Sequence, residues 1–455
     1  MNGGMRLASA RQTALRALER VEQDGAYSGL VLHELLEKAA LAPRDAAFAT
    51  ALFYGVIERL LTLDDMIRPH SKTPLKKQDV TVRNILRMGA YQLAYMDSVP
   101  DSAAVNESVL LCKKNKKTSA AGFVNAVLRA LLRAGKTLTL SGAPNDSARM
   151  SIEFSTPLPL VVMLTRRFGA PRARGILEKS IGAAPLYARV NTVCTTTQSL
   201  IARLADEGVT ACAHEEIPDC ISLYQAGDIT RLSAFSEGLF HIQDASSQLC
   251  ALAVDARKGM TVLDLCAAPG GKSFTIAEGM QNMGTLLSFD LYDFKAGLIR
   301  QGAERLGLSV IQARVGDAAQ YNPALPAADR VLCDAPCSGY GVMRRKPEIK
   351  YKPLDSFEEL QATQTALLGN AARYVRDGGV LIYSTCTLRR EENEAVADAF
   401  LQDNSAFAPR PLPDNLQGCL HEGEHMATIL PDDFDSDGFF IASFIKTGAS
   451  QVNDR

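Results

Sequence analysis

The sequence contains no apolar run long enough to cross a bilayer. Its longest candidate, Leu158 to Leu164, is interrupted by Pro159, whereas a transmembrane helix needs about 20 apolar residues. Near the N-terminus, arginines occur without the apolar stretch that follows them in a secretory signal. We therefore expect no membrane span, and an N-terminal segment that folds as an amphipathic helix.

The sequence also lacks the cysteine spacings of zinc sites and disulfide frameworks. Its ten cysteines are irregularly spaced and none forms a Cys-x-x-Cys pair, the spacing typical of structural zinc sites. A zinc deaminase would place a second cysteine three residues after Cys337, where this chain has Tyr340. The sequence therefore predicts no metal site, and reduced thiols of a cytoplasmic protein.

Composition and charge indicate a globular chain with two unlike parts. The 455 residues are 47% hydrophobic and 22% charged, which favours two or three folded domains. Residues 1–140 carry 20 Lys and Arg against 13 Asp and Glu, and residues 141–455 carry 29 against 38. A basic front part suggests contact with a polyanion, although unevenly charged solvated surfaces would explain the difference equally well.

Apolar positions three and four residues apart predict an all-α bundle over residues 1–140. The expected helices cover 6–23, 28–39, 44–60, 79–95, 102–112 and 119–134. Between the last two helices, the segment 113–117 holds four lysines in five residues. Such a run either contacts phosphates or is a solvated loop.

The pattern changes twice in the rest of the chain. Residues 150–240 mix short helices with strands at 187–193 and 239–243, which predicts a small α+β domain. Over residues 241–455 apolar strands alternate with helices, which predicts a Rossmann-like α/β domain with a doubly wound, largely parallel sheet. Its strands are expected at 261–265, 285–290, 309–314, 329–333 and 380–385, and its helices at 272–280, 294–306, 358–375 and 391–402.

The first of these strands leads into a loop of small residues, Cys266-Ala267-Ala268-Pro269-Gly270-Gly271-Lys272. A nucleotide-triphosphate P-loop would need glycine where Cys266 stands, and a dinucleotide site would need alternating glycines before Pro269. Because backbone N–H groups at a helix N-terminus attract polar ligands, the loop predicts a site for a smaller, adenosine-type cofactor.

Two aspartates follow the next two strands. Asp290 ends the second strand, twenty residues after Gly270, where a carboxylate can accept hydrogen bonds from both ribose hydroxyls. Asp317 follows the third strand and is placed to meet an adenine amino group. The alternative is that both side chains only cap the following helices.

Two thiols follow the last two strands. Cys337 comes three residues after Asp334, and Cys386 comes directly after the fifth strand. Single buried cysteines are usually small core residues, but two at neighbouring strand ends favour covalent catalysis. Addition of a thiolate to C6 of cytosine makes C5 nucleophilic toward a methyl donor. That reaction needs a nucleophile, a carboxyl group near N3 and a second group for elimination, and the two thiols with Asp334 fit these roles.

These segments resemble a known family. LDLCAAPGGKSF, SFD, GDA, DAPCSGYGVMRRKPEIK and YSTCTLRREENE are similar to the ordered motifs of RNA cytosine-5 methyltransferases, as are QDASSQL and DGFFIASF. In front, RQTALRALERVEQDGAYSGLVL to GFVNAVLRALLR resembles the NusB fold, a helical RNA-binding module. Together the resemblances cover nearly the whole chain and are typical of bacterial enzymes that form 5-methylcytosine in 16S rRNA.

The resemblance implies roles for particular residues. S-adenosylmethionine would be the cofactor, held by Cys266, Ala267, Ala268, Pro269, Gly270, Gly271, Lys272, Asp290, Asp317 and Asp334. Cys386 would be the nucleophile and Cys337 would assist product release. The partner would be RNA, either naked 16S rRNA or a small-subunit assembly intermediate, and the enzyme a monomer in the cytoplasm without membrane or metal.

The loop after Cys337 departs slightly from the family pattern at Gly339, Tyr340 and Lys346. We expect Arg344, Arg345 and Lys346 to contact phosphates beside an unstacked or flipped-out base, unless they are only solvated. A free thiol has a pKa of about 8.5, so Cys386 should need a neighbouring cation to ionise, either Lys272 or the bound sulfonium.

Two other classes of function remain as alternatives. One is a methyltransferase that acts on DNA or a small molecule, which the basic helical front and the second thiol at Cys386 disfavour. The other is an RNA-binding assembly factor with an inactive methyltransferase fold. The presence of both Cys337 and Cys386 argues against that second alternative.

Overall fold

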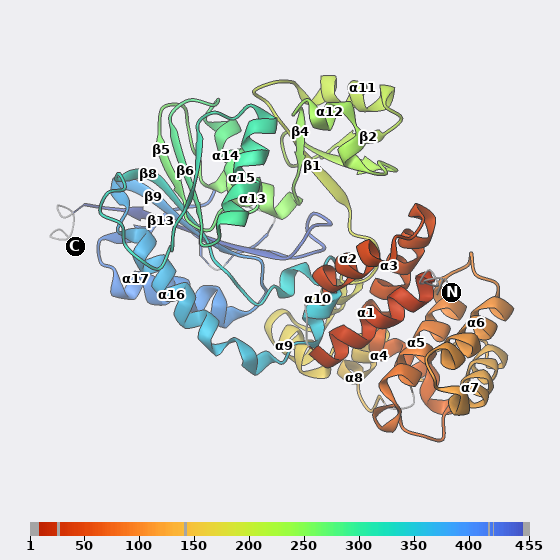
Figure 1. Ribbon diagram of the computed structural model, residues 1–455. Helices are drawn as coiled ribbons and strands as arrows, with labels where there is room; N and C mark the ends of the chain where they lie inside the picture. Colours follow the sequence, from red (N-terminus) through yellow and green to blue (C-terminus); the bar gives the residue numbers. More distant parts are fainter. Residues whose placement is uncertain (1–8, 25–27, 141–142, 417–418, 422, 449–455) are drawn as a thin grey trace. The chain divides into compact units, whose positions relative to one another are not determined.

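The computed structural model describes residues 9–24, 28–140, 143–416, 419–421 and 423–448 (Figure 1). The chain divides into two compact units. The first consists of Met1–Ile181 together with Lys350–Lys352, and the second of Gly182–Ile349 and Pro353–Arg455.

The first unit is helical, as the sequence predicted for residues 1–140, whereas its residues 150–181 were expected to belong to the small α+β domain. Residues 6–8 of the first expected helix lie outside the described residues, and the segment α4 was not expected. The helices are α1 (Ala10–Asp24), α2 (Ser28–Ala39), α3 (Pro43–Glu58), α4 (Leu60–Ile67), α5 (Val80–Tyr95), α6 (Asp101–Lys114), α7 (Ala121–Arg133), α8 (Asp146–Glu153), α9 (Leu158–Phe168) and α10 (Ala170–Lys179).

Capping and apolar burial explain the helical bundle. The carboxylate of Asp79 accepts hydrogen bonds from the backbone N–H groups of Thr81 and Val82 and so begins α5. Phe53 of α3 and Leu128 of α7 are fully buried in one core. Among the described residues no single helix is long and apolar enough to span a membrane, although α3 and Leu60–His70, bent by 78°, meet that test together.

A short segment from far along the chain completes the first unit. Lys350 is fully buried, and its ammonium donates hydrogen bonds to the carbonyl oxygens of Glu58 at 3.0 Å and Phe154 at 3.4 Å. The hydroxyl of Tyr351 donates to the carbonyl oxygen of Ile57 at 2.9 Å. Burial lowers the pKa of Lys350 to about 7. The segment thus binds the C-terminal ends of α3 and α8, where free carbonyl groups favour a cation.

The second unit begins with a small antiparallel sheet in the order β2-β3-β1-β4. Its strands are β1 (Leu186–Val190), β2 (Thr210–Ala213), β3 (Cys220–Tyr224) and β4 (Phe240–Ile242). Leu200 and Leu204 of α11 (Thr197–Asp206) share a core with this sheet. The two strands expected here, at 187–193 and 239–243, are confirmed as β1 and β4.

The larger sheet has the order β11-β12-β13-β9-β8-β5-β6-β7, with β10 also paired to β13. The five predicted strands are confirmed and run parallel, whereas β10 to β13 pair antiparallel and were not expected, so the sheet is mixed. The strands are β5 (Thr261–Asp264), β6 (Thr285–Asp290), β7 (Ile311–Val315), β8 (Ala328–Asp334), β9 (Val375–Thr385), β10 (Phe407–Pro409), β11 (Leu420–His421), β12 (Met426–Ile429) and β13 (Phe439–Lys446).

Helices cover both faces of this sheet. Alternate residues of a strand point to opposite faces, and accordingly Val262 shares a core with α13, α14 and α15, whereas Leu263 shares one with α16 and α17. The helices are α13 (Ala245–Ala253), α14 (Gly271–Gly279), α15 (Asp293–Leu306), α16 (Glu358–Ala372) and α17 (Glu394–Asp403). The doubly wound prediction is confirmed, although α16 ends before the predicted 375 because β9 already begins at Val375.

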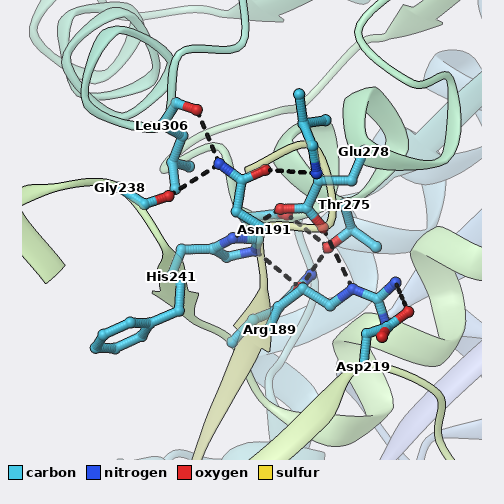
Figure 2. Close-up of polar contacts among 12 residues, drawn as sticks. Arg189, Asn191, Asp219, Gly238, His241, Thr275, Glu278 and Leu306 are labelled. Carbon is cyan, nitrogen blue, oxygen red and sulfur yellow. Dashed lines mark hydrogen bonds and ion pairs between the residues drawn. The ribbon is translucent and has the colours of Figure 1, made fainter. Parts of the chain in front are cut away.

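A buried polar cluster joins the small sheet to α14 (Figure 2). Arg189 of β1 lies 3.3 Å from the carboxylate of Glu278, and the ring of His241 on β4 lies 3.5 Å from its other oxygen. The hydroxyl of Thr275 donates to the side-chain oxygen of Gln243 at 2.6 Å. A buried carboxylate needs partners of this kind. The small sheet therefore holds α14, the helix at the end of the loop of small residues that begins at Cys266.

Candidate active site at the strand ends

The loop of small residues Cys266–Lys272, called the cofactor loop below, connects β5 to α14 through a tight turn. Gly270 has φ +113°, which glycine adopts without strain, and a Cβ atom there would lie 2.5 Å from the ring of Phe274. The backbone N–H of Ala267 donates to the carbonyl oxygen of Phe289 at 2.7 Å. The structure therefore places the loop at a helix N-terminus beside the end of β6, as expected.

Asp264 lies beneath this loop, and the sequence patterns gave it no role of its own. Its carboxylate is fully buried and accepts a hydrogen bond from the hydroxyl of Ser273 at 2.7 Å. Ser273 in turn lies 2.8 Å from the hydroxyl of Ser288 on β6. Burial raises the pKa of Asp264 to about 7. These side chains link β5, α14 and β6 at the base of the loop.

Asp290 and Asp317 lie at the ends of neighbouring strands, since the N–H of Gly316 donates to the carbonyl oxygen of Asp290. Their carboxylates accept hydrogen bonds from the backbone two residues on, at Tyr292 and Ala319 respectively. Asp317 also lines a cavity of about 280 Å³. Its walls include Leu265, Phe289, Gly316, Tyr321 and Tyr374. The mainly apolar wall with one carboxylate suits a planar base with an amino group.

Asp334 at the end of β8 is held on both oxygens. The ammonium of Lys272 lies 2.8 Å from one oxygen, and the hydroxyl of Ser384 donates to the other at 2.8 Å. Burial opposes the charge on Lys272, but the carboxylate of Asp334 raises the pKa of the lysine above its usual value. The pair connects the cofactor loop to the ends of β8 and β9.

The two predicted thiols are in contact. The Sγ atoms of Cys337 and Cys386 lie 3.1 Å apart. The hydrogen bond to Cys386, together with burial, raises the pKa of Cys337 far above its usual value. The same hydrogen bond lowers the pKa of Cys386 against the opposing effect of burial, and Lys272 lowers it further. The two thiols are therefore unequal, with the pKa of Cys386 lowered and the pKa of Cys337 raised.

The basic side chains predicted to contact phosphates differ in their partners and exposure. Arg344 pairs with Asp435 at 2.9 Å, and Arg345 pairs with Asp437 at 2.8 Å and with Asp244 at 2.7 Å. Arg345 and Lys346 are exposed and Arg344 is half-buried, and their contact with phosphates stays a prediction. In the segment 113–117 of the first unit, Lys117 pairs with Asp79 at 2.6 Å, and Lys113, Lys114 and Lys116 are exposed.

All ten cysteines are free thiols. In the described part of the chain, no three His, Cys, Asp or Glu side chains come together in a way that would hold a metal ion. Cys250 and Cys333 are fully buried. Cys266, Cys337 and Cys386 are the partly exposed thiols of the site.

A doubly wound sheet, a glycine turn after its first strand and acids at the next strand ends define the class of S-adenosylmethionine-dependent methyltransferases. Comparison with known proteins narrows the class. Residues 251–445 match the family described as 16S rRNA methyltransferase RsmB/F, residues 8–133 the NusB family, and residues 157–230 the ferredoxin-like domain of RsmF/B-like methyltransferases.

Relatives match over nearly the full length. The chain is 37% identical over 453 residues to the probable ribosomal RNA small subunit methyltransferase B of Bacillus subtilis (strain 168), covering 98% of this chain and all (100%) of that protein. It is 32% identical over 442 residues to ribosomal RNA small subunit methyltransferase B of Salmonella arizonae, covering 96% and 98%. The chain therefore belongs to the family of ribosomal RNA small subunit methyltransferase B.

Solved structures share the fold. PH0851 superimposes with a TM-score of 0.78 at 24% identity, over 95% of this chain and 98% of that one. A methyltransferase homolog protein from Pyrococcus horikoshii gives a TM-score of 0.58 at 28% identity, over 66% of this chain and 98% of that one.

The unequal thiols predict unequal alkylation. Cys386 should react with iodoacetamide at lower pH than Cys337, because its pKa is lowered and that of Cys337 is raised. In Cys337→Ala the hydrogen-bond donor is lost, so the pH midpoint for Cys386 should move upward. Peptide mass spectrometry across a pH series measures the extent of alkylation of both thiols. The exposed Cys212 serves as an internal reference for the activity of the reagent. Earlier reaction of Cys337, or an unmoved midpoint in the variant, would contradict this prediction.

Proposed function

We propose that the protein transfers a methyl group from S-adenosylmethionine to C5 of a cytosine in RNA, with 16S rRNA of the small subunit as substrate. The observation that carries the proposal is the 3.1 Å contact between Cys337 and Cys386 at the ends of adjacent parallel strands. The relatives are ribosomal RNA small subunit methyltransferases by name, which supports the choice of ribosomal RNA. The two thiols support cytosine as the base, because methylation at C5 requires prior addition at C6.

The proposed cofactor site runs along the strand ends. The loop Cys266–Lys272 would hold the amino-acid part, Asp290 the ribose hydroxyls, and the cavity at Asp317 the adenine. Asp334 would border the same site through its ion pair with Lys272. When bound, the cofactor supplies a methyl group on a positively charged sulfur. The apolar cavity wall beside one carboxylate fits this cofactor.

Cys386 would be the nucleophile. Its thiolate forms a bond to C6 of the cytosine, and the electron pair of the C5–C6 double bond becomes available at C5. A lowered pKa increases the fraction of thiolate at neutral pH. The carboxyl group of Asp334 is held by Lys272 and Ser384. It would stabilise the charge that develops on the N3 side of the base during the attack.

Cys337 would assist release. After methyl transfer, C5 still carries its proton, which must leave before the bond between C6 and the sulfur of Cys386 can break and the C5–C6 double bond can return. Cys337 lies beside that sulfur. The raised pKa of Cys337 favours its protonated thiol, which would give that proton to the sulfur of Cys386 as the bond between C6 and sulfur breaks, while the C5 proton passes to solvent.

We further propose a division of labour along the chain. Residues 1–140 and 150–240 would bind RNA, and residues 241–455 would carry the reaction. The matches to the NusB family and to the ferredoxin-like domain support this division, as do the exposed lysines at 113, 114 and 116. Free thiols and ribosomal relatives support a cytoplasmic enzyme acting on rRNA or on an assembly intermediate, and we propose that it acts as a monomer.

Transfer of labelled methyl groups tests the reaction. Wild-type protein should place label on C5 of cytosine in unmodified 16S rRNA, and Cys386→Ala should reduce the rate at least about 1000-fold, because the nucleophile is gone. Cys337→Ala should instead accumulate a protein–RNA adduct that survives a denaturing gel.

Two controls accompany this assay. DNA replaces RNA in one arm, and Cys212→Ala serves as the matched thiol variant, since this cysteine is exposed and far from the site in sequence. An active Cys386→Ala with an inactive Cys337→Ala would reverse the roles of the thiols. No transfer by the wild-type protein to rRNA or to small-subunit precursors would overturn the proposed activity.

Cofactor binding tests the role of Asp290. Asp290→Asn should weaken S-adenosylmethionine binding by roughly ten- to a hundredfold, since hydrogen bonds to a charged group contribute about 1.5–3 kcal/mol. Isothermal titration measures the dissociation constant. Asp293→Asn is the matched control, because that carboxylate is 80% exposed and should leave affinity unchanged. Equal affinities of Asp290→Asn and wild-type protein would remove Asp290 from the site.

A further inference from the structure

Two adjacent side chains with no role in the reaction above are fully buried behind the thiols. Glu392 ends the 3-10 turn Arg390–Glu392, and Asn393 precedes α17. Both have no exposed surface. A buried carboxylate and a buried amide are costly unless they are hydrogen-bonded, so their partners indicate what they hold.

Glu392 holds the loop that carries Cys337. One of its carboxylate oxygens accepts a hydrogen bond from the backbone N–H of Ser338 at 2.8 Å. The same oxygen accepts a second bond from the side-chain amide of Gln364 at 3.0 Å. Ser338 directly follows Cys337, so this bond fixes the backbone next to the thiol.

Asn393 holds both neighbours of Cys386. Its side-chain oxygen accepts from the hydroxyl of Thr385 at 2.5 Å, and its side-chain nitrogen donates to the carbonyl oxygen of Thr387 at 2.9 Å. The hydroxyls of Thr387 and Ser338 lie 2.7 Å apart and connect the two loops directly. Glu392 thus holds the backbone beside Cys337, and the next residue, Asn393, holds the residues on both sides of Cys386.

We propose that Glu392 and Asn393 are positioning residues, Glu392 for the elimination step at Cys337 and Asn393 for the attack by Cys386. The inference rests on the proposed function, because it assigns each residue to one of its two steps. Both residues act through the backbone beside a thiol and touch no reacting atom. Displacement of a catalytic group by about 1 Å can cost a factor of about 100 in rate, so loss of either bond should affect one step selectively.

The two variants should therefore behave differently. Glu392→Ala should keep single-turnover methylation within about threefold of wild type and raise the amount of persistent protein–RNA adduct at least about tenfold, as Cys337→Ala does. Asn393→Ala should slow single-turnover methylation at least about tenfold with no rise in adduct. A merely structural role would slow both steps together and leave the adduct at the wild-type amount.

Further variants separate positioning from folding. Glu392→Gln retains an acceptor oxygen at the same reach and should restore release, whereas Glu392→Asp is too short to reach Ser338 and should accumulate adduct even if Glu392→Ala fails to fold. Glu391→Ala is the matched control, since its neighbouring carboxylate is 59% exposed, and it should match the wild-type protein. S-adenosylmethionine affinity and thermal unfolding verify that each variant is folded.

The outcomes are distinct. If Cys337→Ala traps RNA but folded Glu392→Ala and Glu392→Asp do not, or if Glu392→Ala and Asn393→Ala give the same pattern, the inference is overturned while the proposed function stands. If wild-type protein transfers no methyl group and Cys337→Ala traps no RNA, the proposed function itself fails. Adduct with the Glu392 variants and slow attack with Asn393→Ala would support the inference.

Discussion

The site depends on the contact between two sulfur atoms 3.1 Å apart. The contact makes the two thiols unequal, because the hydrogen bond that lowers the pKa of Cys386 also raises that of Cys337. Two chemically identical side chains thereby differ in the way that their proposed tasks of attack and release would require. The parallel pairing of β8 with β9, with Asp334 opposite Ser384, brings the two strand ends together.

The surrounding structure serves to hold that contact beside the cofactor loop. Apolar residues on both faces of the sheet fix the strands, while buried polar groups fix the loops between them. Lys272 connects α14 to Asp334, and the cluster of Arg189, His241 and Glu278 attaches the same helix to the small sheet (Figure 2). The ion pairs of Lys272 and Glu278 thus both hold α14 in place.

Local sequence patterns were enough to predict the parallel strands and the residues at their ends. The apolar pattern of a strand and the residue types of the loop after it depend only on neighbouring residues. Local patterns missed α4, the antiparallel strands β10 to β13 and the insertion of Lys350 into the first unit, which depend on contacts between distant segments. The ion pairs of Arg344 with Asp435 and of Arg345 with Asp437 and Asp244 were also not expected, because these partners lie about ninety to a hundred residues away in the sequence. Pairing at that separation leaves no local signal. The roles of the site residues stay predictions, although the structure brings them together.

In the proposed reaction Cys386, and not Cys337, attacks the base. RNA containing 5-fluorocytosine tests it most directly, because fluorine at C5 cannot leave as a proton does and the adduct persists after methyl transfer. Trypsin separates the two thiols, since Arg344 ends the peptide with Cys337 and Arg389 ends the peptide with Cys386. Mass spectrometry of the nuclease-treated adduct should find the methylated nucleotide on Cys386; a nucleotide on Cys337 would contradict the account.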